Sequence, residues 1–257
     1  MIIICLGDVV GKNGCEAVFN TLPRLRQQYG ADLVIANGEN SAEGNGILPG
    51  SAERLFSCGV DIITGGNHTF RRREIYDMLE SSEYLLRPAN FPKQAIGHGS
   101  CVYDMGRRRV GVINLIGCVY LEAYDSPFDT ADRIVEQMRD SGINIILVDF
   151  HAEATGEKGA LGYYLDGRVS AVFGTHTHVQ TNDDCILPNG TGYISDLGMC
   201  GPKNSVLGIK PEIAVEKMRT KMPIRFENAE GDSVINGCVF EIDDKSGKTL
   251  HIEKIRL

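Results

Sequence analysis

Five apolar segments of the chain share one design, and they restrict the possible fold more than any other feature. Each begins with a short run of apolar or β-branched residues and ends in polar ones, and in four of the five the polar residue directly follows glycine. Unbroken apolar runs of this length are typical of strands that are buried on both faces of a helix-covered sheet. The five segments are residues 1–8, 32–40, 60–68, 143–151 and 169–178.

Helical and hairpin patterns fill the rest of the chain. Ser126 or Asp129 could cap the last predicted helix, and Gly142 could end it. Residues 100–117 are expected to form a hairpin that turns near 105–108. The predicted helices are 13–30, 47–59, 71–82 and 127–142, and further strand pairs are expected in 185–199, around an Asn-Gly turn, and in 233–257, around 243–248. The order of these predicted strands and helices indicates one α/β domain over residues 1–257, with two mixed sheets face to face and helices outside.

Composition narrows the class of protein. The net charge of −8 argues against a protein that mainly binds nucleic-acid phosphates, so no stable nucleic-acid complex is expected. No apolar run approaches the ~18 residues that a membrane-spanning helix needs. The N-terminus lacks the basic region of a signal peptide, and the eight cysteines are scattered without a CxxC motif. These features predict reduced thiols and a cytoplasmic protein.

The polar ends of the five segments contain the residues best suited to bind ligands or metal ions. The carboxyl ends of strands in an α/β sheet are where ligands bind, so we expect these side chains to lie together. Four of the six histidines of the chain are among them. A mixed set of oxygen and nitrogen donors suits Mn, Fe or Zn rather than Mg or Ca alone, and glycine before most of them permits close approach of the backbone. The set consists of Asp8, Glu39, Asn40, Asn67, His68, His151, His176 and His178.

Each of these motifs has a simpler interpretation when it is taken alone. Asp8 could cap the following helix, residues 37–40 could be a turn, and His151 could be a hydrogen-bonded interior histidine. His176 and His178 could close a strand as a polar turn. As residues i and i+2 of an extended chain, about 6.6 Å apart, they could instead bind one ion together or two neighbouring ions. The conjunction of all five strand ends favours a binuclear metal site.

Over residues 7–178 the chain resembles the calcineurin-like binuclear metallophosphoesterases, because its motifs follow the order of theirs: D, GE-N, GNH, H and GTHTH. Two departures are visible: Val10 stands where that superfamily has its first histidine ligand, and Glu39 replaces the usual bridging aspartate. These departures, with GDVVG, NGEN, DFHAEAT and GTHTHVQT, resemble the YmdB-type bacterial phosphodiesterases over nearly the whole chain. The resemblance implies a four-layer α/β/β/α sandwich of two mixed sheets.

The resemblance also implies an activity, a cofactor and residue roles. The activity is hydrolysis of 2′,3′-cyclic nucleotides, and of 3′,5′-cyclic ones in some members, with two transition-metal ions, iron or manganese before zinc. Members of the family often form homo-oligomers. His68 would act as the general acid, and Asn40 would replace the ligand lost at Val10. The first metal would be held by Asp8, Glu39, Asn40 and His178, and Glu39 would bridge to a second held by Asn67, His151 and His176.

The expected mechanism follows from two cations about 3.5–4 Å apart, which lower the pKa of a bridging water. The resulting hydroxide attacks phosphorus, and His68 protonates the leaving oxygen, a role that accelerates the reaction by about 10²–10⁴-fold.

Two other functions fit the same residues: a phosphomonoesterase or nucleotidase, and a non-catalytic, metal-dependent sensor of nucleotides or RNA ends. Arg71–Arg73 could bind phosphate, but a basic run at the start of a helix is more typical of a solvated face. Glu153, Thr155 and Lys158 could line the pocket.

Overall fold

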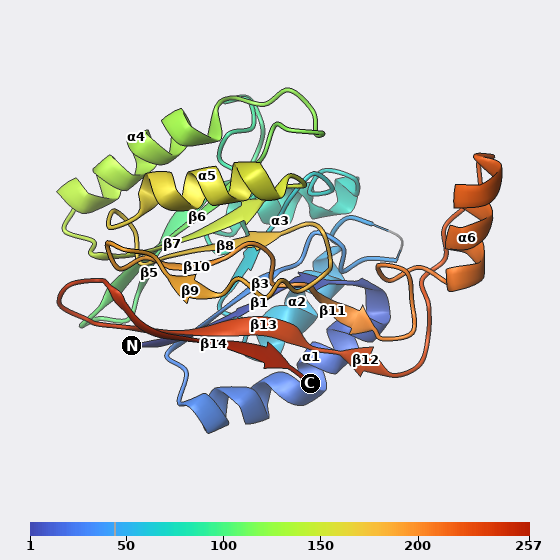
Figure 1. Ribbon diagram of the computed structural model, residues 1–257, viewed down its shortest axis with the longest axis horizontal. Helices are drawn as coiled ribbons and strands as arrows, with labels where there is room; N and C mark the ends of the chain where they lie inside the picture. The colour runs from blue at the N-terminus through green and yellow to red at the C-terminus, as the bar shows by residue number, and fades with distance from the viewer. Residues whose placement is uncertain (44) are drawn as a thin grey trace.

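The computed structural model describes residues 1–43 and 45–257, and it shows two mixed sheets packed face to face (Figure 1). Side chains of both sheets, such as Ile3, Phe240, Leu147 and Phe173, form the core between them. The first sheet has the order β14 (Thr249–Arg256), β13 (Asn236–Ile242), β1 (Ile2–Leu6), β3 (Leu33–Asn37), β4 (Ile62–Thr64). The second has the order β5 (Ser100–Asp104), β6 (Arg109–Ile116), β7 (Ile145–His151), β8 (Ala171–Thr175), β10 (Gly192–Ile194), β9 (Cys185–Ile186).

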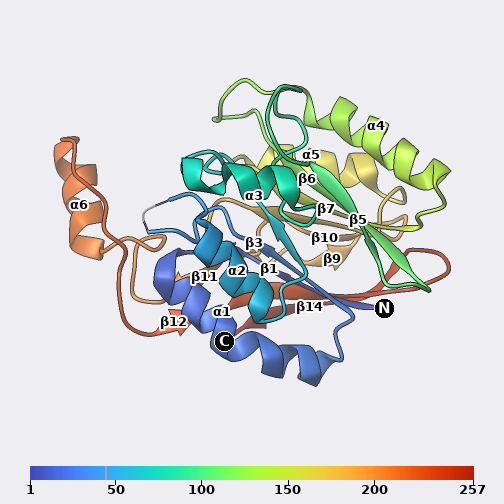
Figure 2. The same cartoon turned by 180° about the vertical axis from the view of Figure 1, so that it is seen from behind.

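Helices cover the outer face of each sheet, which confirms the predicted four-layer sandwich (Figures 1 and 2). The outer face of the first sheet packs against α1 (Gly11–Tyr29), α2 (Pro49–Ser57) and α3 (Tyr76–Ser81). The outer face of the second packs against α4 (Pro127–Asp140) and α5 (Thr155–Leu165). Strands β1, β3, β7 and β8 are therefore buried on both faces, as their unbroken apolar runs predict.

The predicted ends of α4 and the predicted hairpins are also confirmed. The Ser126 hydroxyl accepts a hydrogen bond from the Asp129 backbone N–H at 3.2 Å, so Ser126 is the cap and Asp129 is not. Gly142, at φ 76°, takes the left-handed conformation just after the helix. Strands β5 and β6, β9 and β10, and β13 and β14 pair antiparallel as expected.

Two helices and a small sheet were not predicted. Helix α5 contains three glycines, which lower helix propensity, but Gly162 is needed because a Cβ there would lie 2.6 Å from the Tyr193 ring. Helix α6 (Pro211–Thr220) projects from the body of the molecule within a region predicted to be β-rich (Figure 1). A small third sheet has the order β12 (Ser233–Val234), β11 (Met199–Pro202), β2 (Asp8–Val9). In the described part of the chain, no helix is long and apolar enough to cross a membrane.

Candidate metal centre

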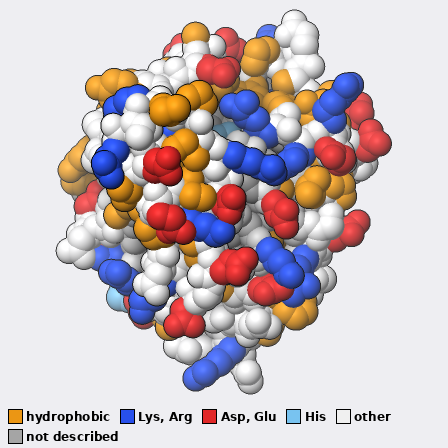
Figure 3. Space-filling view, turned by 90° about the vertical axis from the view of Figure 1, so that its right-hand side faces the viewer, with side chains coloured by type: hydrophobic (Ala, Val, Ile, Leu, Met, Phe, Trp, Pro, Cys, Tyr) orange, Lys and Arg blue, Asp and Glu red, His pale blue; other side chains and the backbone are white. Residues whose placement is uncertain are grey.

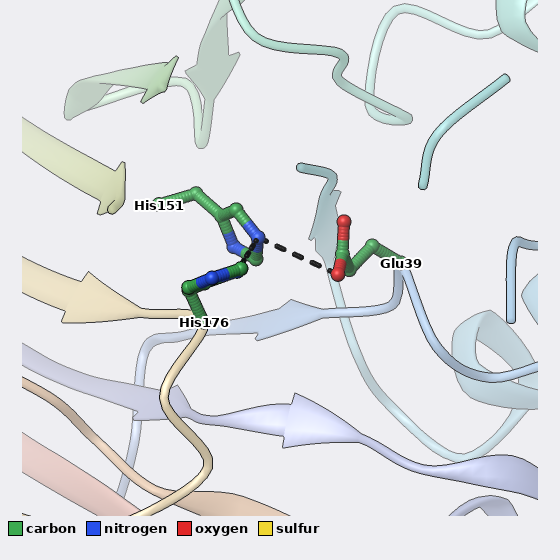
Figure 4. A group of neighbouring side chains, drawn as sticks. All are labelled: Glu39, His151 and His176. Atoms are coloured by element: carbon green, nitrogen blue, oxygen red, sulfur yellow. Dashed lines mark hydrogen bonds and ion pairs between the residues drawn. The ribbon is translucent and has the colours of Figure 1, made fainter. Parts of the chain in front are cut away.

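The eight predicted site residues lie together at the carboxyl ends of five strands. Asp8 lies in β2, just after β1, and His151 is the last residue of β7; the others follow β3, β4 and β8. A ring nitrogen of His151, a ring nitrogen of His176 and an oxygen of Glu39 all lie within 4.8 Å of one another (Figure 4). Asp8, Glu39 and His151 are at most 1% exposed, so the centre of the cluster is shielded from solvent.

Glu39 lies at the middle of the cluster. Its Oε1 is 3.4 Å from His151 Nε2 and 3.0 Å from His68 Nδ1, and it accepts a hydrogen bond of 2.9 Å from the Asn40 side chain. Its Oε2 accepts one of 2.8 Å from the His68 backbone N–H. Gly66 makes this approach possible, because a Cβ there would lie 2.4 Å from both Glu39 Oε2 and His151 Nε2.

The remaining donors form two neighbouring groups, one on each side of Glu39. In one group His151 Nε2 lies 2.9 Å from Asn67 Oδ1 and 3.0 Å from His176 Nδ1. In the other group His178 Nε2 lies 3.7 Å from Asp8 Oδ1 and 3.2 Å from the Asn40 amide nitrogen. The family resemblance assigns the members of these groups to two ligand sets, and that assignment stays a prediction.

The backbone at the two histidines differs from the extended chain that was assumed from the sequence. Strand β8 ends at Thr175, and His176 and His178 have φ values of 100° and 64°, in the region that favours glycine. The assumption of an extended i, i+2 pair was therefore wrong. The two rings face different groups, because His178 Nδ1 donates to the Leu207 carbonyl at 3.0 Å, which leaves Nε2 to face Asp8.

The hydrogen bonds around His151 direct its Nε2 toward buried oxygen atoms. Thr175 Oγ1 donates to Asp149 at 2.7 Å, so it accepts from His151 Nδ1 at 2.9 Å. His151 Nε2 then faces two oxygen acceptors, Asn67 Oδ1 and the Glu39 carboxylate, so it carries a proton in the metal-free protein and offers a lone pair to a metal once that proton is lost. Asp8 Oδ1 is buried and has no hydrogen-bond partner among the described residues. Buried lone pairs without donors are unfavourable, and a bound cation would satisfy them, so the donor set fits metal ions.

The charges of the site act strongly on its titrating groups. Burial by itself would raise the pKa of Glu39, but His151 and His68 hold that pKa well below its usual range. Burial lowers the pKa of His151, yet Glu39, Asp8 and Asp149 outweigh burial and raise it to about 9. Burial and the neighbouring His151 lower the pKa of His176 to about 3. His176 is thus a neutral ring ready to donate a lone pair, whereas His151 must lose a proton before it can bind a metal.

Binding of Mn²⁺ at pH 7 is therefore expected to release about one proton from His151. With a pKa of about 9, this ring is protonated at pH 7 and deprotonated only as the pH rises past that value. Calorimetric titrations with Mn²⁺ in two buffers of different ionisation enthalpy measure the released protons directly. An apparent binding enthalpy that is the same in both buffers at pH 7 would contradict the expectation.

The other residues singled out from the sequence divide into structural and site-facing groups. Arg72 donates to the Asn45 carbonyl at 3.1 Å and to the Glu43 carbonyl, so it holds a loop rather than being free for phosphate. Glu153 Oε2 lies 3.0 Å from His176 Nε2, and Lys158 donates to the carbonyl of Thr175 at 2.9 Å. The supporting roles of Thr175 and Asp149 were missed, because a buried threonine or aspartate inside a strand carries no pattern of its own.

A cavity of about 690 Å³ opens between the start of α1 and residues 225–230. Val10 lines it, and the backbone N–H of the next residue, Gly11, donates to the Asn40 carbonyl at 2.8 Å. Lys12, Arg72 and Phe226 are among the other lining residues. A volume of this size is in the range of small-molecule sites. On the face of the molecule that carries α6, basic and acidic side chains alternate (Figure 3).

Several solved structures share the fold of this chain. A hypothetical protein from Thermus thermophilus superposes with a TM-score of 0.94 at 38% identity, over 100% of this chain and 99% of that chain. A novel phosphatase from Mycoplasma pneumoniae gives 0.94 at 37% identity, over 100% and 93%. The 5′-nucleotidase precursor from Thermus thermophilus shares only the fold, with a TM-score of 0.61 at 15% identity over 54% of its own chain.

The model of the family described as YmdB-like protein matches residues 4–255, and the chain belongs to this family. The chain is also 44% identical to the 2′,3′-cyclic-nucleotide 2′-phosphodiesterase of Bacillus subtilis (strain 168), over 99% of this chain and 96% of that protein. The predicted family is therefore confirmed.

Proposed function

We propose that the protein is a two-metal phosphodiesterase that hydrolyses 2′,3′-cyclic nucleotides. The observation that carries the proposal is the pair of donor groups that share Glu39 at the strand ends. The phosphodiesterase class predicted from the sequence is confirmed by a relative that is 44% identical and is named as such an enzyme. The metal-binding character of the site agrees with the fold and with the Glu39, His151 and His176 cluster.

The proposed roles of the site residues are metal binding and proton transfer. Asp8, Asn40 and His178 on one side, and Asn67, His151 and His176 on the other, would each hold one ion, with Glu39 between them. Two bound cations lower the pKa of a water and neutralise the charge of the phosphoryl oxygens. His68 is the proposed general acid: its Nδ1 faces Glu39 Oε1 at 3.0 Å, so Nε2 can carry a proton to the leaving oxygen.

The proposed reaction opens the cyclic phosphate at the 2′ oxygen. Water loses one proton to the solvent as its oxygen bonds to phosphorus, the bond from phosphorus to the 2′ oxygen breaks, and the 2′ oxygen takes a proton from His68, which regains one from the solvent. The product would be the nucleoside 3′-monophosphate. The name of the Bacillus subtilis relative, which specifies a 2′-phosphodiesterase, supports this choice of bond.

Incubation of the Mn²⁺-loaded protein with 2′,3′-cyclic AMP is expected to yield 3′-AMP. Liquid chromatography against 2′-AMP and 3′-AMP standards separates the two products. Formation of 2′-AMP would overturn the choice of bond while leaving the phosphodiesterase intact. A parallel assay with p-nitrophenyl phosphate tests the alternative of a phosphomonoesterase, which requires the monoester to react far faster than the diester.

Several finer features are part of the proposal. Iron or manganese would be the native metals, with zinc also compatible with the donor set. Two further predictions from the sequence concern activity and binding: turnover of 3′,5′-cyclic nucleotides and the lack of a stable nucleic-acid complex. Three others concern setting and assembly: a cytoplasmic and bacterial protein, a homo-oligomer, and a single domain over 1–257. A metal-loaded protein without turnover of any cyclic nucleotide would favour the alternative of a regulatory sensor.

A further inference from the structure

The beginning of helix α5 contacts His176 from two directions. Lys158, only 2% exposed, donates from Nζ to the Thr175 carbonyl at 2.9 Å and to Asp196 Oδ2 at 2.7 Å. Asp196 Oδ2 also accepts from the Thr177 backbone N–H at 3.0 Å. The Thr175 carbonyl and the Thr177 N–H belong to the two peptide groups that flank His176. The Lys158–Asp196 pair therefore holds the backbone on both sides of this residue.

His176 needs such support because of its backbone conformation. Its φ of 100° is rare for a residue with a side chain, and conformations of this kind persist only where the surroundings enforce them. Its backbone N–H donates to Asp8 Oδ2 at 3.0 Å, which adds a third restraint. A buried lysine is unfavourable unless it is paired and hydrogen-bonded, and both partners of Lys158 serve this one turn.

Glu153, which precedes α5, acts on the ring of the same histidine. Its Oε2 lies 3.0 Å from His176 Nε2. The negative charge of a carboxylate at this distance favours the tautomer of the neutral histidine whose proton lies on Nε2, because a carboxylate attracts an N–H and repels a lone pair. Nδ1 then carries the lone pair, and it is the atom that faces His151 Nε2 at 3.0 Å. A carboxylate that fixes a histidine in this way commonly tunes a metal ligand.

We propose that Glu153 and Lys158 are positioning residues for His176, Glu153 by selecting the ring tautomer and Lys158 by fixing the flanking peptides. The inference rests on the proposed two-metal site, in which His176 holds one of the ions. Neither side chain has to touch the substrate or a metal in this role. Their loss should therefore weaken the ion held by His176 and spare the ion on the Asp8 side.

Calorimetric titration of the whole protein with Mn²⁺ tests the proposal without any substrate. Glu153→Ala is expected to weaken one of two Mn²⁺ sites by about 10–100-fold, the usual effect of losing such a partner. Glu153→Gln keeps an acceptor for Nε2–H and should restore most of the affinity. Lys158→Met should weaken the same site. Glu153 is half exposed, so its variants should fold even if Lys158→Met is unstable.

Arg26→Met is the matched control for a general loss of stability. Arg26 also lies on a helix and binds a loop carbonyl and an aspartate, Gly59 at 2.8 Å and Asp61 at 3.1 Å, but at the opposite end of the strands. It should leave both Mn²⁺ affinities unchanged. Wild-type affinities in Glu153→Ala, or equal losses in Arg26→Met and Lys158→Met, would overturn the proposal.

The ring tautomer of His176 can be observed by ¹⁵N-resolved NMR of the protein before metal is added. The wild type should show the proton on Nε2, and Glu153→Ala should show a mixture of tautomers. A wild-type proton on Nδ1 would also overturn the inference. Because neither readout involves turnover, failure of the proposed cyclic-nucleotide hydrolysis would be distinguishable from failure of this inference.

Discussion

Replacement of His68 by alanine is expected to slow hydrolysis of 2′,3′-cyclic AMP by about 10²–10⁴-fold, the usual contribution of a general acid. His68 is about one-quarter exposed, whereas the donor atoms around it are buried, so it lies at the edge of the cluster that a substrate can reach. Its Nδ1 contacts Glu39 and Asn40 at 3.0 Å. Because Nδ1 faces Glu39 and Asn40, Nε2 is the ring atom left to give a proton to the leaving oxygen.

Metal content separates this role from ligation. The His68→Ala protein should still bind two ions per chain, because His68 is not among the proposed metal ligands. His251→Ala is a suitable control, since the His251 side chain is 63% exposed and lies on β14. Turnover at the wild-type rate would remove His68 from the role of acid, and loss of metal would make it a ligand instead.

Replacement of Glu39 by glutamine is expected to remove both metal ions and nearly all activity. The Glu39 carboxylate contacts members of both groups, His151 at 3.4 Å and Asn40 at 2.9 Å, and it is 1% exposed. Glutamine has nearly the same size but no charge, so the negative charge between the two cations would be lost. We expect Mn²⁺ affinity to fall by more than about 100-fold, beyond the effect of losing an outer partner.

His178→Ala provides the contrast, because His178 faces only the Asp8 group. Calorimetry should show weakening of one Mn²⁺ site in His178→Ala and of both sites in Glu39→Gln. Glu241→Gln, at an exposed position on β13, should have no effect on either site. Equal losses in His178→Ala and Glu39→Gln would contradict a bridging position for Glu39.

Much of the fold could be predicted because burial on two faces leaves a clear pattern in β1, β3, β7 and β8. Strands β2 and β12 have two residues each, too few to show any periodicity. Helix α5 was missed because its glycines resemble loop composition, although Gly162 is there for contact with Tyr193. The form of these elements depends on tertiary contacts that local sequence does not contain.

The candidate site could be predicted as a set of residues but not as a geometry. Strand ends converge at one edge of each sheet, so residues far apart in sequence, such as Asp8 and His178, could be expected to meet. The positive φ of His176, by contrast, depends on Lys158 and Asp196, which lie 18 positions before it and 20 after it. The Glu153 contact with His176 depends on the same fold-level packing.

The most direct test of the two-metal phosphodiesterase is metal analysis of the protein purified without chelator, paired with an assay on 2′,3′-cyclic AMP. Two transition-metal ions per chain are expected, together with hydrolysis that a chelator abolishes and Mn²⁺ restores. Hydrolysis that persists after complete removal of metal, or a fully loaded protein that turns over no cyclic nucleotide, would contradict the account.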